Sequence, residues 1–372
     1  MKSFKSFCKN KEILVLDIGS HSVKAVVGKY DKNKVSVHNA FCVSIPQDCY
    51  ADGKIINLLE VKEALKKALE INKVKAKSTI SSIESTCIIT REILLPAVKE
   101  EDLKGMIYYE VGQYLPIELD KYVIQHKIIE EFMEENVKKY SILVAALPRE
   151  IAFSHFELLE FLDLSPVALE LHSNAITKLL DVNAVINDIE AIRDKSIAVI
   201  DLGHKHINVI IIENGVYRFS RIINLGAGDM DMIIANYLNI DLKEVEIQKY
   251  AMKNLTSSLE EVVVSNEGIS LNKSELSFDI FHDVIKSNLD NWIDEINRIF
   301  KYYTSRSSRN KIDSIFIYGG STALNAIDQY MTDAFNIPTF RIDRINHVEF
   351  LENSTMDDLS IYLNAISSLI RK

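Results

Sequence analysis

Two apolar runs flank a polar turn in Ile13–Val27, ILVLDIGSHSVKAVV, and this stretch most constrains what the chain can fold into. Short apolar runs bounded by a turn signal predict a buried strand that returns beside itself as a hairpin. The turn contains Asp17 and Gly19, which are common turn residues, so taken alone it indicates only a hairpin with a polar turn. The pattern carries more weight because it occurs twice.

The residues of this turn are also the types that hold a phosphate and its metal ion. Gly19 lets a ligand approach the backbone closely, and the turn amides with the hydroxyls of Ser20 and Ser22 can surround a phosphate. Asp17 ends the predicted strand and can hold Mg²⁺ through water, the usual way this ion is bound beside phosphates. A phosphate and magnesium site is therefore one function that the turn could serve.

The pattern returns in Ile197–Ile212, IAVIDLGHKHINVIII, about half a chain later. When this stretch is laid on the first without gaps, Asp201 falls on Asp17 and Gly203 falls on Gly19. A repeat at this separation indicates duplicated domains. Two such hairpins facing each other would form a two-sided clamp for a polyphosphate.

Length and composition narrow the class of protein. The chain has 372 residues, which favours two domains or one two-lobed molecule over a single core. Its net charge of −10 argues against a general nucleic-acid partner. The basic start is followed by an apolar run that Asp17 cuts short, so it does not predict a secretory signal or direct membrane insertion. The four cysteines lack CxxC spacing and indicate reduced, cytosolic thiols: Cys8, Cys42, Cys49 and Cys87.

The first half of the chain predicts an α/β domain with a smaller unit inserted in it. A helix over Asn57–Lys73 and a strand over Thr79–Ile89 follow the opening hairpin. The smaller unit spans about 91–146 and contains a helix over Glu100–Tyr114. The polar passage Asn183–Asp194 is expected to link the two lobes.

The second half predicts several further elements. Gly226 and Gly228 precede a helix whose N-terminal amides could face phosphate. A polar stretch over Ser257–Phe278 predicts a small peripheral sheet, and a long amphipathic helix runs from Phe281 to Tyr303. Further predictions are a helix with Glu246 and Lys249, a strand over Lys311–Ile317 with the turn Gly319-Gly320-Ser321, and a last helix over Met356–Ile370.

Taken in order, these motifs resemble the actin/Hsp70/sugar-kinase ATPase superfamily, and within it FtsA and, more closely, the PilM family of type IV pilus assembly proteins. The resemblance covers nearly the whole chain. The segments that carry it are DIGSHSVKAV, ITREILLP, YYEVGQYLPIELDKY, LVAALPRE, EFLDLSPVALEL, VIDLGHKHINVIIIENG, RIINLGAGDM, EINRIFKYY, IDSIFIYGGS and YLNAISSLIR. Their common order and spacing are more specific than any one of them.

The resemblance implies a fold with domain boundaries. We expect an actin-like, duplicated RNase H-like α/β fold with an FtsA/PilM-type inserted subdomain. The first lobe would span 1–185 with its insert at about 91–146. The second would span 195–372 with a peripheral subdomain at about 253–310, and its final helix could dock back on the first lobe.

The resemblance also implies ATP and Mg²⁺ in a cleft between the lobes. The positions that match the family's nucleotide motifs are Asp17, Gly19, Ser20, Ser22 and Lys24 in the first phosphate motif, Asp201 and Gly203 in the second, Gly226 and Gly228 at the phosphate-side helix, Glu246 and Lys249 at the ribose and base, and Gly319, Gly320 and Ser321 in the adenosine turn. Asp17 and Asp201 would hold Mg²⁺ through water.

The second motif departs from the family's pattern. Ile207 replaces a Ser or Thr, and His204-Lys205-His206 replaces small residues. We therefore expect ATP binding with weak or absent hydrolysis. Taken alone, Glu246 and Lys249 indicate an exposed helix pair that contributes about 0.3 kcal/mol, and the order of the motifs is what favours the nucleotide role.

The family further implies a role in assembling a type IV pilus or a related secretion machine. The expected partner is the short cytoplasmic N-terminal segment of a PilN-like inner-membrane protein, held between the first lobe and the insert. That partner would recruit this cytoplasmic chain to the inner face of the membrane. Self-association, an FtsA-like filament-forming division protein, a sugar or acetate kinase, and a nucleotide-free scaffold of the same fold remain open alternatives.

Overall fold

The computed structural model describes residues 11–114, 118–190, 192–251, 273–351 and 358–371, without the side chains of 273–280. The chain divides into two compact units. The first contains residues 1–178, 349–356 and 364–372, and the second contains residues 179–348 and 357–363. In the described part of the chain, no helix combines the length and the apolar composition that crossing a bilayer requires.

The first unit is built on a six-stranded sheet in the order β10-β6-β1-β2-β3-β16. Its strands are β1 (Ile13–Ile18), β2 (Ser22–Asp31), β3 (Lys34–Ser44), β6 (Ser78–Ile83), β10 (Ser165–Leu171) and β16 (Val348–Phe350). β1 pairs with β2 as the predicted antiparallel hairpin and with β6 in parallel. Every residue of β1 is buried, as expected of a strand in the middle of a sheet covered on both faces.

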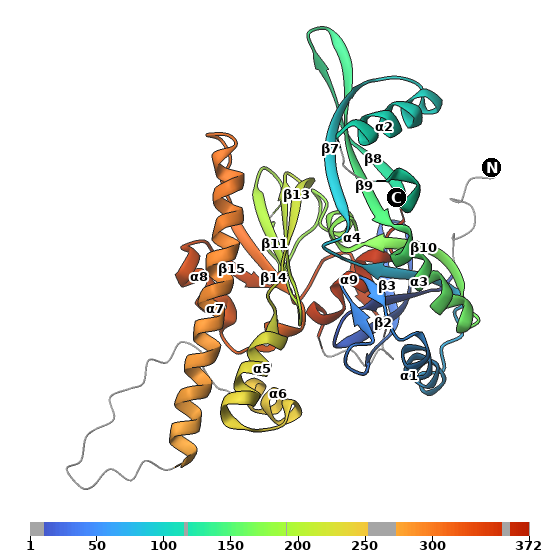
Figure 1. The fold of residues 1–372 in the computed structure, drawn as a ribbon. Coiled ribbons are helices and arrows are strands. Elements are labelled where there is room, and N and C mark those ends of the chain that lie inside the picture. The colour runs from blue at the N-terminus through green and yellow to red at the C-terminus, as the bar shows by residue number, and fades with distance from the viewer. Residues whose placement is uncertain (1–10, 115–117, 191, 252–272, 352–357, 372) are drawn as a thin grey trace. The chain divides into compact units, whose positions relative to one another are not determined.

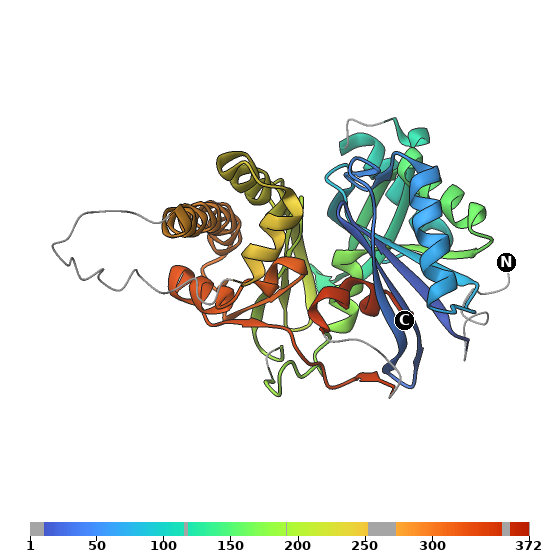
Figure 2. The same cartoon turned by 90° about the horizontal axis from the view of Figure 1, so that it is seen from below.

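Helices of this unit pack on that sheet. They are α1 (Leu58–Ile71), α3 (Arg149–Phe161), α4 (His172–Leu179) and α9 (Leu363–Ser368), with a short hairpin of β4 (Tyr50–Ala51) and β5 (Lys54–Ile55). Figure 2 shows α1 lying along one face of the sheet. Val61 and Leu65 of α1 are fully buried there against Leu14 and Leu16 of β1. Asn57 begins α1 by accepting a hydrogen bond from the Glu60 amide, as the cap pair predicted.

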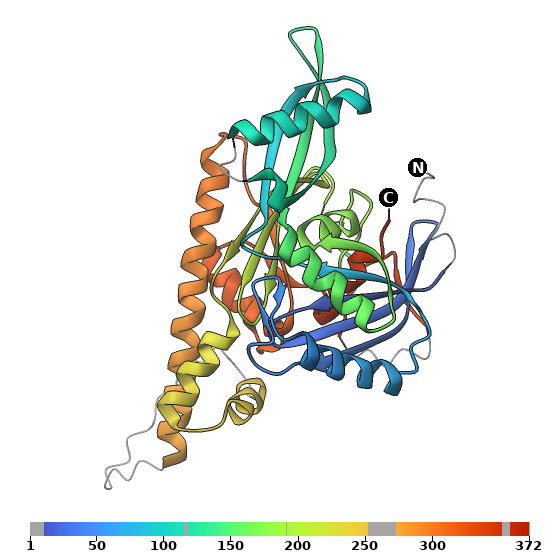
Figure 3. The ribbon, with the colours of Figure 1, turned by 45° about the vertical axis from the view of Figure 1, so that its right-hand side comes forward.

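The insert has a core of its own within the first unit. Its elements are β7 (Ile89–Pro96), α2 (Glu100–Tyr114), a 3₁₀ turn η2 (Leu119–Lys121), β8 (Tyr122–Glu134) and β9 (Val137–Pro148). The three strands form a sheet in the order β7-β9-β8. Leu103, Ile107 and Val111 of α2 pack on one face of this sheet against Ile142 and Val144, as α2 lies across it in Figure 3. The opposite face of the sheet is not covered by α2.

The second unit repeats the topology of the first. Its five-stranded sheet has the order β13-β12-β11-β14-β15, which matches the order β3-β2-β1-β6-β10 position by position. The strands are β11 (Ser196–Leu202), β12 (Ile207–Glu213), β13 (Val216–Ile223), β14 (Ser314–Tyr318) and β15 (Thr339–Arg341). The repeat seen in the sequence is therefore a repeat of the fold.

The helices of the second unit pack on one face of this sheet (Figure 1). They are α5 (Ala227–Leu238), α6 (Leu242–Ala251), α7 (Lys273–Ser305) and α8 (Ile327–Phe335), with 3₁₀ turns η3 (Gly320–Ala323) and η4 (Ser360–Tyr362). α7 contributes Phe281, Leu289, Trp292 and Tyr303 to the same core as the sheet. The predicted amphipathic stripe thus belongs to the main core of this unit.

Three predicted elements differ from the structure. The strand predicted over Thr79–Ile89 ends at Ile83 as β6, and Ile89 begins the next strand, β7. The peripheral sheet predicted over Ser257–Phe278 lies outside the described residues up to 272, and the rest of it is wrong because Lys273–Phe278 is the start of α7. That stretch contains no Gly or Pro, so nothing in it stops the helix from extending toward its N-terminus. The last helix is shorter than predicted, with α9 covering only Leu363–Ser368 after η4.

The C-terminal segment is buried on the first unit. Leu369 is fully buried, and its Cδ1 lies within 2.8 Å of the position that a Cβ would take at Gly28 of β2. Ser368 and Ser82 of β6 share a hydrogen bond of 2.9 Å between their hydroxyls. These contacts make the segment part of the core of the first unit.

We predict that Leu369→Ala lowers the free energy of unfolding by about 3 kcal/mol, because it removes a fully buried side chain and leaves a cavity. The measurement is urea unfolding followed by circular dichroism. Ile71→Ala, at a position that is 67% exposed, is the control and should change stability by less than about 0.5 kcal/mol. Equal effects of the two substitutions would contradict docking of this segment.

Candidate functional site

Asp17 lies at the end of β1, where two neighbouring strands bring further polar residues beside it. It pairs with Lys24 across the antiparallel hairpin and with Ser82 on the parallel strand β6. The residue is only 5% exposed. A carboxylate this deeply buried requires charged or hydrogen-bonding partners, because burial without them costs several kcal/mol.

His172 and Asn364 supply partners that the sequence did not reveal. The His172 Nε2 lies 3.0 Å from the Asp17 Oδ1. Burial by itself raises the pKa of Asp17. The charge and hydrogen bond of His172, the charge of Lys24 and a hydrogen bond with Asn364 outweigh it and hold this pKa below the ordinary value of 3.8. Asp17 is therefore an ionised carboxylate at neutral pH, as a water-mediated Mg²⁺ site requires.

The turn after β1 is tight at Gly19. The Gly19 amide donates to the Ser22 carbonyl over 3.1 Å, which closes the turn. A Cβ at Gly19 would lie 3.2 Å from that carbonyl and 3.6 Å from the Lys24 Nζ. A side chain at this position would therefore press on the Ser22 carbonyl, with the Lys24 ammonium at ordinary contact distance. Ser22 is buried and Ser20 is half-buried. Both residues belong to the hairpin that contains Asp17.

Asp201 occupies the equivalent place in the second unit. It is the last residue but one of β11, and it pairs with Asn208 across the hairpin and with Tyr318 on the parallel strand β14. Asn208 therefore stands where the first unit has Lys24. The second hairpin keeps the carboxylate but lacks the cation, which is a further difference between the two halves.

The Gly319 turn packs directly on Asp201. Gly319 has φ of +97°, a conformation that glycine adopts without strain. A Cβ there would lie 2.3 Å from the Asp201 Oδ1, so only glycine fits. Ser321 is 2% exposed and its Oγ donates to the Gly203 carbonyl over 3.4 Å. The second phosphate motif and the predicted adenosine turn thus meet in one place.

The start of α5 differs from its predicted role. The Ala227 amide donates to the Gly203 carbonyl over 3.1 Å, and the Gly228 amide donates to the His204 carbonyl over 2.8 Å. The Gly226 amide donates to the Asp229 carboxylate over 3.2 Å. The amides expected to face a phosphate are therefore already bonded to the protein, as in a capped helix.

Gly226 and Gly228 are needed here for close packing. A Cβ at Gly226 would lie 2.2 Å from the His204 carbonyl oxygen, and a Cβ at Gly228 would lie 2.6 Å from the His204 ring. His204 belongs to the segment that replaces the family's small residues. The loop of the second motif and the helix start therefore form one packed corner. Within the described residues, no cluster of three His, Cys, Asp or Glu side chains could hold a metal ion.

Lys249 forms a buried ion pair rather than the exposed helix pair considered for it. Its Nζ lies 2.5 Å from the Asp231 Oδ1 of α5, and the Lys249 side chain is 2% exposed. The next residue, Tyr250, donates its hydroxyl to the Gly320 carbonyl over 3.4 Å. α6 therefore lies beside the Gly319 turn, with Glu246 half-buried one turn earlier on the same helix.

The predicted site residues thus gather into two half-sites, each within its own unit. The first half-site contains Asp17, Gly19, Ser20, Ser22 and Lys24 at the end of β1. The second contains Asp201, Gly203, Gly226, Gly228, Gly319, Gly320 and Ser321, with Glu246 and Lys249 on the adjoining α6. The first half fits a phosphate with its cation. The second offers Asp201 and the Gly319 turn but no unbonded amide at residues 226–228.

This pair of duplicated sheets with an aspartate at the end of each central strand defines an actin-like ATPase fold. The chain aligns with the PilM–PilN type IV pilus biogenesis complex at a TM-score of 0.78 and 15% identity, over 98% of this chain and 100% of that one. It also aligns with the ethanolamine utilization protein EutJ from Carboxydothermus hydrogenoformans at 0.54 and 11%, over 97% and 90%. MreB5 of Spiroplasma citri bound to AMPPNP aligns at 0.50 and 15%, over 90% and 92%.

The family follows from the sequence comparison. The family model described as type IV pilus assembly protein PilM matches residues 15–266, more than half of the chain. The model of the cell division protein FtsA matches residues 198–360. The chain belongs to the PilM family, so the predicted family and the predicted actin-like fold are both confirmed.

We predict that Lys249→Met destabilises the protein by about 3 kcal/mol, because it leaves the Asp231 carboxylate buried and uncompensated. The double variant Lys249→Met/Asp231→Leu should recover most of this loss, since two apolar residues replace the pair. Urea unfolding measures both. A double variant as unstable as the single one would contradict the assigned ion pair.

We also predict a specific pH dependence for Asp17. Because its folded pKa is depressed, the ionised carboxylate adds stability at neutral pH, and that contribution is lost as pH falls below 3.8 through the folded pKa. The free energies of unfolding of wild type and Asp17→Asn, measured at a series of pH values, should therefore differ most at neutral pH and converge in acid. Glu84→Gln should show the opposite trend, gaining stability relative to wild type as pH rises, because burial raises the pKa of Glu84.

Proposed function

We propose that this PilM-family chain binds ATP·Mg²⁺ and holds the N-terminal cytoplasmic segment of a PilN-like inner-membrane protein during pilus assembly. The observation that carries the nucleotide part is the ionised, buried Asp17 beside Lys24 and the tight Gly19 turn. In this proposal Lys24 and the turn amides bind phosphate, and Asp17 orders the water shell of Mg²⁺. The magnesium ion would neutralise phosphate charge when bound.

The second half-site would contribute Asp201 and the adenosine turn. Gly320 has no neighbour within 4 Å of an added Cβ, so the backbone there is open to a ligand. MreB5, which shares the fold, was crystallised with AMPPNP. That this fold relative carries a nucleotide supports the same class of ligand here.

We further propose that hydrolysis is weak or absent. Asn208 stands at the place of a phosphate-binding cation, Ile207 is fully buried in the core, and the amides at the start of α5 are already hydrogen-bonded. The second half-site therefore has fewer groups for stabilising developing charge than the first. ATP would then act by binding one conformation of the chain more tightly than another, which shifts their populations, and not by being hydrolysed in a cycle.

The partner segment is proposed to bind the open face of the insert. Leu94 of β7 is 54% exposed on the face opposite α2. It pairs with Ser141 of β9, and half-buried Leu143, two residues further along β9, lies on the same face. Lys127 of β8 reaches from this face to Asn174 of α4 over 3.2 Å. An apolar surface beside a strand suits an extended peptide. The match to a PilM–PilN complex supports the kind of partner, which would recruit the chain to the inner face of the cytoplasmic membrane.

A nucleotide-free scaffold is the second candidate. The observation that favours it is the capped start of α5, where the Gly203 and His204 carbonyls already accept the Ala227 and Gly228 amides. A scaffold of this kind would keep the fold and the partner surface and bind no ATP. Titration with ATP·Mg²⁺ separates the two functions.

Calorimetric titration with ATP·Mg²⁺ should give saturable binding to wild type. Asp17→Ala should weaken it at least about tenfold, because it removes the charge that orders the metal's water shell. Asp31→Ala, an exposed aspartate at the end of β2, is the matched control and should bind as wild type does. Failure of wild type to bind at any concentration would favour the scaffold.

The proposed binding of the partner is tested with a synthetic peptide that copies the N-terminal cytoplasmic segment of the PilN-like inner-membrane protein. Fluorescence anisotropy should show binding that Leu94→Glu abolishes, because a buried interface excludes an unpaired carboxylate. Tyr109→Glu replaces a 65% exposed residue on α2 and should leave binding unchanged. Equal losses in both variants would place the peptide elsewhere.

A further inference from the structure

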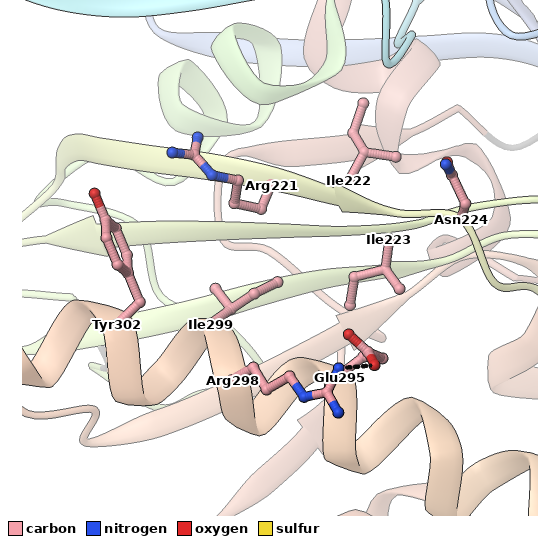
Figure 4. Close-up of a pocket in the computed structure, with 8 residues that line it drawn as sticks. All are labelled: Arg221, Ile222, Ile223, Asn224, Glu295, Arg298, Ile299 and Tyr302. Carbon is pink, nitrogen blue, oxygen red and sulfur yellow. Dashed lines mark hydrogen bonds and ion pairs between the residues drawn. The ribbon is translucent and has the colours of Figure 1, made fainter.

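A groove of about 440 Å³ lies between the edge strand β13 and the helix α7 in the second unit (Figure 4). Ile223 and Ile299 line it from the two elements, and Arg221 and Arg298 stand at its sides. The Tyr302 ring makes cation–π contacts with Arg221 and Arg306, whose guanidinium groups lie 6.0 and 5.7 Å from its centroid. The groove is apolar inside, and its rim carries two cations, Arg221 and Arg298, and one anion, Glu295, in a chain whose net charge is −10.

The strand beside this groove has one edge without a partner strand in the described part of the chain. β13 pairs with β12 and ends the sheet order on that side. An edge strand offers backbone N–H and C=O groups to any further strand. Arg221 lies at this edge, where its Nη1 donates to the Ser220 carbonyl over 2.9 Å. A strand added here would need acidic side chains to meet Arg221 and Arg298, and an apolar one between them to meet the isoleucines.

Strand β8 of the insert carries that pattern. It is likewise an edge strand, in the sheet order β7-β9-β8. After its bulge, Glu130, Phe132 and Glu134 follow at every second position, so they share one face of the strand. This face reads acidic, apolar, acidic, as the β13 groove demands. We propose that β8 of one copy of this chain adds to the β13 edge of a second copy, with Glu130, Phe132 and Glu134 facing α7.

Charge explains why unlike edges pair and like edges do not. A symmetric pairing of two β13 edges centred on Phe219 and Ser220 sets Arg218 of one copy opposite Arg221 of the other, which is destabilising. Charged residues on an edge normally block such pairing. Here one edge is basic and the other acidic, so the charges block self-pairing of each edge and favour contact between the two.

Forming this interface costs little free energy, because the ion pairs that its charged residues would give up lie at the surface. Glu134 is exposed and is ion-paired with half-buried Lys139 of the same hairpin. On the other side, Arg298 is ion-paired with Glu295 and is 74% exposed. Exposed pairs of this kind contribute little to stability, so they can be replaced by contacts across the interface. Because the two surfaces differ, each copy presents one of each and association continues from copy to copy.

The test is a charge swap followed by sedimentation velocity at rising protein concentration. Wild type should show concentration-dependent association that weakens with salt. The variants R221E/R298E and E130K/E134K should each weaken it about tenfold or more. The matched controls K66E/K67E and E63K/E70K make the same charge changes on exposed positions of α1 and should associate as wild type does.

Mixing the two variants distinguishes this interface from others. Each variant alone has like charges on its two edges, whereas both possible contacts between unlike variants have complementary charges, so an equimolar mixture of R221E/R298E and E130K/E134K should regain association with the two variants alternating. The quadruple variant should associate as wild type does. A wild type that stays monomeric at every concentration, or a mixture in which association is not restored, would overturn the proposal.

Discussion

An ionised carboxylate buried at the end of the central strand of the first unit is the constraint on which the candidate site depends. Asp17 can keep its charge there only because His172, Lys24 and Asn364 face it. These partners come from β2, the start of α4 and the C-terminal segment, so residues far apart in the chain must pack together around one carboxylate. The same contacts that stabilise the charge also fix the end of β1, next to the turn where a phosphate would bind.

The second unit meets the same demand in a different way. Gly319 packs against the Asp201 carboxylate, and the corner formed by His204 with Gly226 and Gly228 encloses the loop that follows it. Asn208 replaces the cation that the first unit places across its hairpin. Duplication has preserved the topology of the sheet and the position of the aspartate, while the surrounding donors have diverged. The nucleotide role therefore depends more on the first half-site than on the second.

The sequence predicted the features that depend on local pattern and repetition. The hairpins, the aspartates and the family could be inferred because Ile13–Gly28 and Ile197–Ile212 align without gaps. His172 could not, because nothing in its neighbourhood signals contact with a residue more than 150 positions earlier. The buried pair of Lys249 with Asp231 joins two helices, whereas helix spacing suggested a pair with Glu246. The capped start of α5 was hidden because the Ala227 and Gly228 amides donate to backbone carbonyls, which every residue has.

Hydrogen exchange of the whole chain, with and without ATP·Mg²⁺, tests the central claim of a nucleotide site built on two unequal halves. We expect the nucleotide to slow exchange at Gly19–Lys24 and at Gly319–Ser321, where the backbone would contact it. Residues 226–229 should be protected in both states, because their amides already donate to the protein. Slowing confined to residues 226–229, or no change in either turn at saturating nucleotide, would contradict this division of roles.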